Sequence, residues 1–150
     1  MTDYVLGLQF NHERHMVLLL EKRRPEWQRG QYNGVGGKIE PGETALEAMC
    51  REWHEETGMM QCHKWHNFAR LEAPGVYSVE FFRSFSSLEL MLEAGLYTLA
   101  HPALEQIGVF PIKHLPRTIP NTEWFIRMAL NFDRDHVTKF IVTEVKELAA

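Results

Sequence analysis

Residues 36–59 read GGKIEPGETALEAMCREWHEETGM, which joins a glycine-rich turn, a run of helix-forming residues and a glycine stop. Thr44 is followed three residues later by Glu47, the spacing of a capping box at a helix start. Gly58 suits the left-handed backbone conformation that ends many helices. The stretch therefore predicts a loop followed by a helix over residues 44–57.

The predicted helix has an apolar side and an acidic side. At about 100° per residue, the expected buried stripe consists of Leu46, Met49, Cys50 and Trp53. The acidic side carries Glu52, Glu55 and Glu56, whose spacing puts them on one face. Like charges at this spacing cost roughly 0.2–0.5 kcal/mol per pair in an isolated helix, and Arg51 alone does not neutralise three carboxylates.

Two interpretations of this acidic face are open. One is a solvated charged surface, which is what most charge runs are. The other is a site for a divalent cation, held through carboxylate oxygens while phosphate oxygens complete its coordination. Ligands of this kind, with no cysteine or histidine among them, suit Mg²⁺ or Mn²⁺.

The spacing of the whole stretch distinguishes these interpretations. Gly37 is followed by five residues, Glu43, seven residues and then REWHEETGM over residues 51–59. This pattern resembles the Nudix box, the signature of the Nudix hydrolase family. Trp53 and Met59 stand where the family usually has aliphatic residues; both are large and apolar, so the chemistry of the box is retained.

The resemblance implies an α/β (α+β) fold of the Nudix type, an α/β/α sandwich with a mixed β-sheet. It implies a Mg²⁺ cofactor, with Mn²⁺ as a substitute. The implied metal ligands are the Gly36 carbonyl and the carboxylates of Glu52, Glu55 and Glu56. The implied catalytic set is completed by Arg51, which orients a glutamate, and Glu43, which supports the same network, while Lys38 and Gly37 approach phosphate. The general base stays open between a box glutamate and Glu105.

The order of the remaining patterns agrees with such a sandwich. Strands are expected over residues 3–10 and 16–20, joined by a hairpin, and over 65–72, 76–85, 109–112 and 137–145. A helix capped near residues 121–123 has Trp124, Phe125, Met128, Ala129 and Phe132 as its apolar stripe. Residues 86–108 carry no clear pattern. Residues 1–150 are predicted to form a single Nudix hydrolase domain.

Composition restricts the partners. The formal net charge of −4 provides no basic footprint for duplex nucleic acid, whereas a metal can supply the positive charge that a small phosphorylated substrate requires. There is no signal-peptide pattern at the N-terminus and no apolar run of the ~20 residues that span a membrane. We expect a cytoplasmic protein, monomeric or homodimeric, that binds a small nucleotide.

Substrate choice depends on residues outside the box. Trp27 is a candidate for stacking on a base, and Asn33 matches the base-contacting asparagine of the branch that hydrolyses oxidised purine nucleoside triphosphates. That branch has adjacent aspartates where Asn121 and Thr122 stand here, and a stacking tryptophan where this chain has Ile119. Trp124 follows these positions closely and is a further candidate for contact with the substrate.

The predicted reaction is hydrolysis of a phosphoanhydride in a nucleoside diphosphate linked to a further group. Conversion of a ribo- or deoxyribonucleoside triphosphate to monophosphate and pyrophosphate is the first expectation. ADP-ribose or a dinucleoside polyphosphate is the alternative substrate. A non-catalytic nucleotide-sensing module is disfavoured because all box glutamates are present, and the acidic balance disfavours an RNA-end hydrolase.

Overall fold

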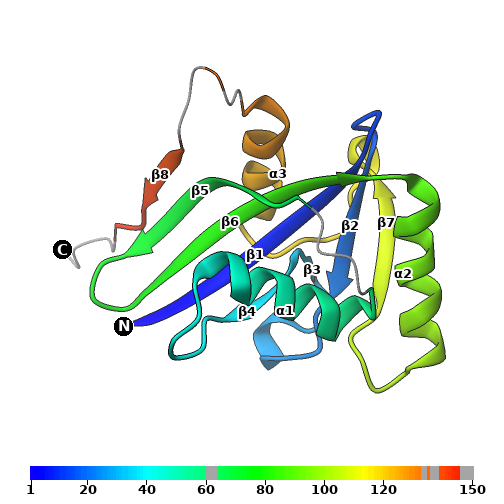
Figure 1. The fold of residues 1–150 in the computed structure, drawn as a ribbon, viewed down its shortest axis with the longest axis horizontal. Coiled ribbons are helices and arrows are strands. Elements are labelled where there is room, and N and C mark those ends of the chain that lie inside the picture. Colours follow the sequence, from blue (N-terminus) through cyan, green and yellow to red (C-terminus); the bar gives the residue numbers. More distant parts are fainter. Residues whose placement is uncertain (60–63, 133–134, 136–138, 146–150) are drawn as a thin grey trace.

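The structure is a computed structural model that describes residues 1–59, 64–132, 135 and 139–145 (Figure 1). The strands are β1 (Thr2–Asn11), β2 (Met16–Glu21), β3 (Tyr32–Asn33), β4 (Val35–Lys38), β5 (His66–Ala73), β6 (Tyr77–Ser86), β7 (Ile107–Pro111) and β8 (Phe140–Thr143). The α-helices are α1 (Ala45–Thr57), α2 (Leu88–Ala100) and α3 (Thr122–Asn131), and short 3₁₀ turns cover Glu26–Gln28 and Ile112–His114.

A mixed eight-stranded sheet forms the centre of the molecule. Its order is β3-β2-β1-β6-β5-β8, with β4 added to β1 and β7 added to β2. Strand β1 pairs in parallel with β6 over its whole length, but its other edge is divided between two antiparallel partners: β2 at Gln9 and Phe10, and β4 at residues 4–7. This division places the glycine segment of β4 where β1 and β2 separate.

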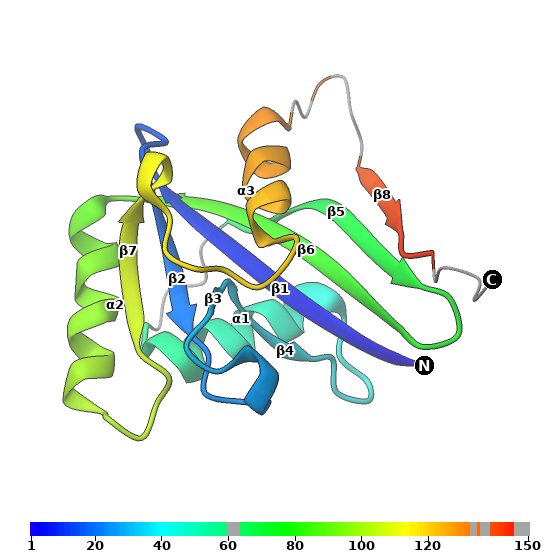
Figure 2. The ribbon, with the colours of Figure 1, turned by 180° about the vertical axis from the view of Figure 1, so that it is seen from behind.

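Helices cover both faces of the sheet, and each face has its own apolar core. On one face, Ala48, Met49 and Trp53 of α1 pack with Met91 and Ala94 of α2 against strand residues. On the other face, α3 contributes Phe125, Ile126 and Ala129 to a second cluster, and Phe132, which directly follows the helix, belongs to it as well. Figure 2 shows the view from behind, in which α3 covers the sheet. The α/β/α sandwich predicted from the sequence is therefore confirmed.

Helix α1 begins and ends as its sequence predicts. The Thr44 hydroxyl accepts a hydrogen bond from the Glu47 backbone, the Glu47 carboxylate accepts one from the Thr44 backbone, and Gly58 ends the helix at φ 69°. Its buried face differs from the predicted stripe in one respect. Leu46 is 48% exposed, whereas Ala48 is fully buried, because the face of α1 that packs on the core passes through Ala45, Ala48 and Met49.

The other elements contain four departures from the sequence-based expectation. Gly36 and Gly37, expected in a turn, lie in strand β4, because they pair with β1. Helix α2 occupies the stretch for which no element was predicted. In α3, Trp124 was expected on the buried face but is 63% exposed, and Ile126 is buried instead. The face of α3 toward the sheet consists of Thr122, Phe125, Ile126 and Ala129. Strand β8 is shorter than the predicted 137–145, and residues 137–138 lie outside the described residues. Within the described residues, no helix combines the length and apolarity needed to cross a membrane.

Gly95 in the middle of α2 provides a test of this packing. An added Cβ there would have its nearest neighbour, the Ile107 carbonyl oxygen, at 3.5 Å, which is an ordinary contact. Since glycine in a helix interior costs about 0.5–1 kcal/mol relative to alanine, we expect Gly95→Ala to raise the free energy of unfolding by about that amount. Urea denaturation measures the change, and a loss of stability would contradict the packing of α2 on β7.

Candidate metal and nucleotide site

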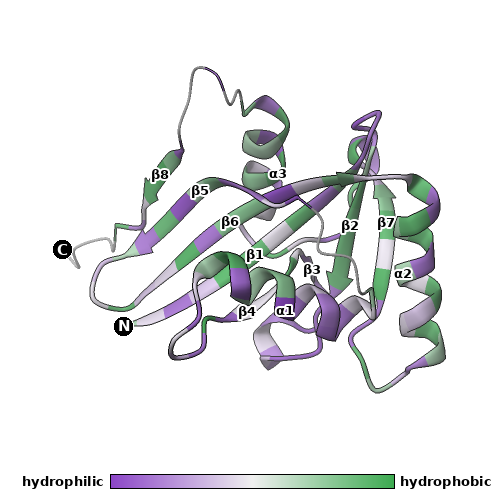
Figure 3. Cartoon of the chain, viewed as in Figure 1, coloured by the Kyte–Doolittle hydropathy of each residue, from purple (hydrophilic) through white to green (hydrophobic). Residues whose placement is uncertain are grey.

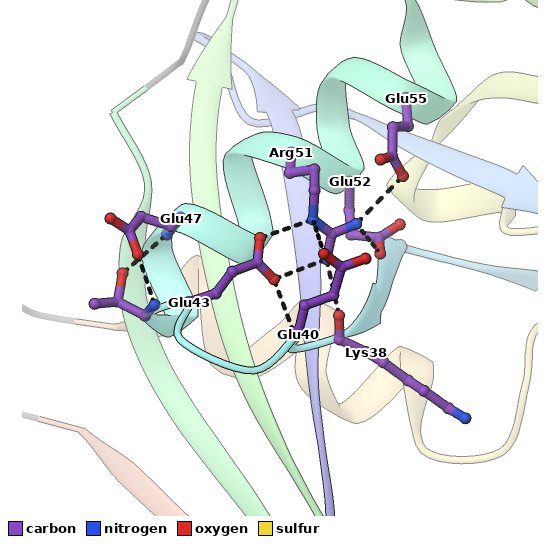
Figure 4. A network of polar contacts seen from close by, with 8 residues as sticks. Lys38, Glu40, Glu43, Glu47, Arg51, Glu52 and Glu55 are labelled. Atoms are coloured by element: carbon purple, nitrogen blue, oxygen red, sulfur yellow. Dashed lines mark hydrogen bonds and ion pairs between the residues drawn. The ribbon is translucent and has the colours of Figure 1, made fainter.

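Arg51 is the centre of an ion-pair network on α1 (Figure 4). Its guanidinium donates two hydrogen bonds to the Glu43 carboxylate, at 2.7 and 2.9 Å, and one to the Lys38 carbonyl at 2.9 Å. It also donates to Glu52 at 2.8 Å and to Glu55 at 3.3 Å. The hydrogen bond from Arg51 holds the pKa of Glu43 below its usual range. Arg51 therefore ties the acidic face of α1 to the loop that precedes the helix.

Glu56 lies deeper than the other box glutamates and faces the glycine strand. Its carboxylate accepts a hydrogen bond from the Gly36 backbone N–H at 3.3 Å. Burial raises the pKa of Glu56 to about 8, with a further contribution from the neighbouring Glu52 carboxylate. Burial also raises the pKa of Glu52, although its contact with Arg51 acts in the opposite direction. The positive charge around these two carboxyls is not sufficient to offset the cost of ionising them in a buried position.

Gly36 and Gly37 are required by close approaches on both sides of β4. A Cβ on Gly36 would lie 2.0 Å from the Val5 carbonyl oxygen of β1, and a Cβ on Gly37 would lie 2.3 Å from a Glu52 carboxylate oxygen. Only glycine leaves room for the sheet pairing and for the carboxylate together. The glycine segment thus forms the wall against which the acidic face of α1 is placed.

The donor set of this site fits a hard divalent cation. Within the described residues, no three His, Cys, Asp or Glu side chains converge on one point as a metal-binding group; Glu52 and Glu55 turn toward Arg51, and Glu56 turns toward Gly36. The raised pKa values of Glu52 and Glu56 nevertheless identify carboxyls whose ionised form requires additional positive charge. A bound ion with oxygen ligands would supply that charge.

Glu105 lies near this cluster but is already paired. Its carboxylate forms an ion pair with Lys22 at 2.9 Å and accepts a hydrogen bond from the Arg23 backbone N–H. Glu56 and Glu105 line the same cavity of about 350 Å³, together with Arg23 and others. Lys22, which was not among the predicted site residues, also lowers the pKa of Glu56 through its charge. The signal in the sequence that could have identified Lys22 as a site residue is the run of three basic residues at positions 22–24.

A larger cavity of about 680 Å³ begins at Gly36 and Gly37 and extends across the opposite face of the sheet from α1. Apolar and aromatic side chains line most of it, among them Tyr4, Leu6, Leu71, Tyr77, Val79, Phe81, Ile119 and Phe125. The rings of Phe81 and Phe125 stack with centroids 3.7 Å apart. None of these aromatic residues was predicted for the site, since each reads in the sequence as ordinary core.

Of the predicted nucleotide contacts, Trp27, Asn33 and Asn121 line this cavity. Trp27 is 63% exposed on the short turn after β2. Trp124 is not among the residues that line the cavity, because its position on α3 turns it toward solvent. Lys38 is exposed, and its side chain extends away from the carboxylates (Figure 4).

Hydrogen bonds fix the orientation of the Asn33 amide. Its Oδ1 accepts from the Gly34 backbone N–H at 2.8 Å and from the Thr122 hydroxyl at 3.2 Å. A backbone N–H can only donate, so the atom that faces it is the amide oxygen, not the nitrogen. The Nδ2 group is thereby left as a donor at the cavity. Thr122 thus helps to orient the Asn33 amide. In the sequence it was noted only because it stands where the related branch has an aspartate.

The raised pKa of Glu56 predicts how stability depends on pH without metal. Between its unfolded value of 4.5 and its folded value of about 8, the unfolded chain ionises Glu56 while the folded chain keeps the proton. The contribution of Glu56 to stability is thus highest at low pH and is lost as the pH rises toward 8. From pH 5.5 to 8 we expect a loss of about 3 kcal/mol from this group.

Urea denaturation in EDTA across this pH window measures the dependence. Glu56→Gln removes the titrating group, so this variant should have a flatter profile and be more stable than the wild type at pH 8. An equal slope in both proteins would assign the pH dependence to other residues.

An α/β/α sandwich with a glutamate-rich helix against a glycine strand defines the class of Nudix hydrolases. A family model for the NUDIX domain matches residues 2–125, and the chain belongs to this family. The family and enzyme class predicted from the sequence are therefore confirmed.

Solved structures share the fold. A mutT/nudix family protein from Listeria innocua is 19% identical, with 86% of this chain and 91% of that chain covered and a TM-score of 0.65. An ADP-ribose pyrophosphatase from Streptococcus suis is 14% identical, with coverage of 95% and 98% and a TM-score of 0.64. Among curated proteins, 8-oxo-dGDP phosphatase NUDT18 of Mus musculus is 40% identical over 57 residues, which are 38% of this chain and 17% of that relative.

Proposed function

We propose that the chain is a Mg²⁺-dependent pyrophosphohydrolase that converts a nucleoside triphosphate, ribo or deoxyribo, to the monophosphate and pyrophosphate. The observation that carries this proposal is the continuity of the large cavity, which extends from Gly36 and Gly37 at the acidic cluster to Asn33 and a pair of stacked aromatic rings. A nucleotide whose base lies in the apolar part of the cavity would thus have its phosphates directed toward the carboxylates of α1. The partial match to an 8-oxo-dGDP phosphatase is consistent with a purine nucleotide.

The residues have distinct roles in this reaction. Glu52, Glu55, Glu56 and the Gly36 carbonyl would hold the ion, which supplies positive charge to the phosphate oxygens and to the attacking water when bound. The water oxygen forms a bond to phosphorus, the anhydride bond breaks, and pyrophosphate leaves. Arg51 and Glu43 fix the carboxylates in position, and Lys22 lies near Glu56 as a further positive charge.

Proton acceptance is the role of a box glutamate in this proposal. Burial raises the pKa of Glu56 in the chain without metal, and its carboxylate faces the Gly36 backbone, so Glu56 is the candidate base in this proposal. Glu105 is less suited because Lys22 and the Arg23 backbone already occupy its carboxylate.

The proposal is tested by product analysis with Mg²⁺ over canonical and oxidised nucleoside triphosphates, nucleoside diphosphates, ADP-ribose and dinucleoside polyphosphates. Monophosphate plus pyrophosphate from a triphosphate is the expected result. Cleavage confined to ADP-ribose or dinucleotides would favour the alternative substrate class. The observation that supports this alternative is the length of the cavity, whose lining extends as far as Tyr77 and Glu144. No cleavage of any substrate would move the assignment to a nucleotide-sensing module.

One structural neighbour was solved in complex with DNA. The Shewanella oneidensis NrtR chain solved with a 27mer DNA shares the fold at 14% identity and a TM-score of 0.63, but this chain covers only 59% of it. The net charge of −4 disfavours a duplex partner here, and the retained box glutamates favour catalysis.

Base recognition is tested by Asn33→Ala. Because Asn33 presents its Nδ2 donor to the cavity, its removal is expected to change the ranking of bases more than the rate on the best one. A base with an acceptor at the matching edge should lose about 5–50-fold in kcat/KM, the value of a hydrogen bond of roughly 1–2 kcal/mol. Uniform loss across all bases would instead make Asn33 a structural residue.

A further inference from the structure

The segment between β2 and β3 carries an arginine, Arg24, whose charge is not used within the protein. Among the residues that the structure describes, Arg24 forms no hydrogen bond and no ion pair, whereas Arg23 donates to the Pro102 carbonyl at 2.8 Å and Arg29 lies 3.7 Å from the Glu26 carboxylate. The hydropathy colouring of Figure 3 shows this segment as hydrophilic, in contrast to β2. The guanidinium of Arg24 therefore has all of its N–H donors available for a ligand.

Arg24 stands where the two cavities described above approach each other. Of the described residues, it is the one that lines both the cavity of about 350 Å³ and the cavity of about 680 Å³. Glu56 lines the smaller cavity and Gly36 lines the larger one, and the hydrogen bond of 3.3 Å from the Gly36 N–H to the Glu56 carboxylate connects them. The acidic cluster thus forms the boundary between the two cavities, and Arg24 lies beside this boundary.

This position suits the phosphates farthest from the base. In the proposed function, on which this step rests, the base lies near Asn33 in the larger cavity and the first phosphate lies near Gly36 and Gly37. Phosphates that continue past Gly36 come to the side of Glu56, which is the side of the smaller cavity. A guanidinium there matches phosphate oxygens in a planar, bidentate arrangement. Arg24 is therefore placed to contact the end of the phosphate chain.

The charges around the smaller cavity require an additional cation for such a ligand. Glu56 and Glu105 both line this cavity, and two carboxylates repel a phosphate. The charge of Lys22 is already matched by Glu105, whose carboxylate lies 2.9 Å away and also accepts the Arg23 backbone N–H. The unpaired guanidinium of Arg24 supplies the positive charge that the terminal phosphates lack.

We propose that Arg24 binds the two terminal phosphates of a nucleoside triphosphate and thereby selects triphosphates over diphosphates linked to a sugar. When the anhydride bond breaks, its electron pair stays on the oxygen of the leaving pyrophosphate, so negative charge grows on the group that Arg24 contacts. Arg24 therefore stabilises the transition state more than the bound substrate, and its loss should lower kcat more than it raises KM. A diphosphate linked to a sugar has no terminal phosphate and gains nothing from Arg24.

Steady-state kinetics with Mg²⁺ on nucleoside triphosphates and on ADP-ribose test this selection. Arg24→Ala is expected to lower kcat/KM about 10–100-fold on triphosphates, mostly in kcat, and less than about threefold on ADP-ribose. Arg24→Lys keeps the charge without the planar fork and should recover part of the loss. Arg29→Ala removes an arginine of the same segment that lines neither cavity, and this matched control should retain wild-type values. Equal losses on both substrates, or no loss on triphosphates, would overturn the proposal.

Calorimetric titration with inorganic pyrophosphate in Mg²⁺ tests Arg24 independently of the reaction. The wild type should bind pyrophosphate, and Arg24→Ala should bind it at least about tenfold more weakly while its affinity for GMP stays unchanged. If the wild type cleaved no triphosphate, the proposed reaction would fail, but this selective loss of pyrophosphate affinity would still support the assignment of Arg24. A wild type that does not bind pyrophosphate, or equal pyrophosphate affinity in the wild type and Arg24→Ala, would overturn that assignment.

Discussion

Glu56→Gln and Glu55→Gln are each expected to lower turnover by at least about 100-fold while the protein stays folded. The carboxylates are lost as ligands of the ion, and loss of even an outer-shell partner of a metal typically costs 10–100-fold. The effect should be larger at Glu56, because its carboxylate lies deeper and accepts the Gly36 N–H, whereas the Glu55 side chain is 54% exposed.

Folding is expected to survive these substitutions for a physical reason. The Glu56 carboxyl is costly to ionise where it stands, so a neutral amide of nearly the same shape removes a penalty. Turnover measured over a range of Mg²⁺ concentrations, together with calorimetric titration of Mg²⁺, separates lost metal affinity from lost chemistry. Glu93→Gln on α2, an exposed helical glutamate remote from the cluster, is the control and should retain wild-type turnover. Unchanged turnover in both Glu55 and Glu56 variants would refute the metal assignment.

The elements that could be predicted from the sequence are those with local signals. The capping box at Thr44 and Glu47 and the stop at Gly58 depend on neighbours in the chain, and the structure has them as predicted. Helix α2 could not be read in this way. Its inner and outer faces are both apolar, so the contrast between a polar and an apolar side, from which a helix is recognised, is absent.

The same distinction applies to the site: residues placed by local spacing could be predicted, and residues brought together by the fold could not. The order of Arg51, Glu52, Glu55 and Glu56 on one helix follows from spacing alone. Gly36 and Gly37, which the sequence presents as a turn, lie in strand β4 because they pair with β1. The large cavity does not follow from spacing, because Tyr4, Phe81 and Phe125 come from β1, β6 and α3 and meet only when the sheet is assembled. Trp124 illustrates the converse: it is close to Asn121 in sequence, but the helix turns it away from the cavity.

Gly37→Ala is expected to lower turnover by about 10–100-fold with only a modest change in stability. A Cβ at this position would lie 2.3 Å from a Glu52 oxygen and 2.5 Å from its carboxyl carbon. These atoms are the end of a flexible side chain, so the sheet can keep its pairing of Gly37 with Val5 while the carboxylate moves. Glu52 would then lose its 2.8 Å contact with Arg51 and its place among the ligands.

Gly108→Ala is the matched control for this effect. Gly108 also lies in a strand, and its added Cβ would meet the Phe110 ring at 2.6 Å, a comparable overlap with a side chain outside the acidic cluster. Both variants should lose stability by about 1–3 kcal/mol at most, but only Gly37→Ala should lose turnover and Mg²⁺ affinity. Equal turnover in the two variants would mean that the position of the Glu52 carboxylate does not matter. A selective loss would assign to Gly37 a role that its missing side chain alone explains: it leaves the space in which a box glutamate stands.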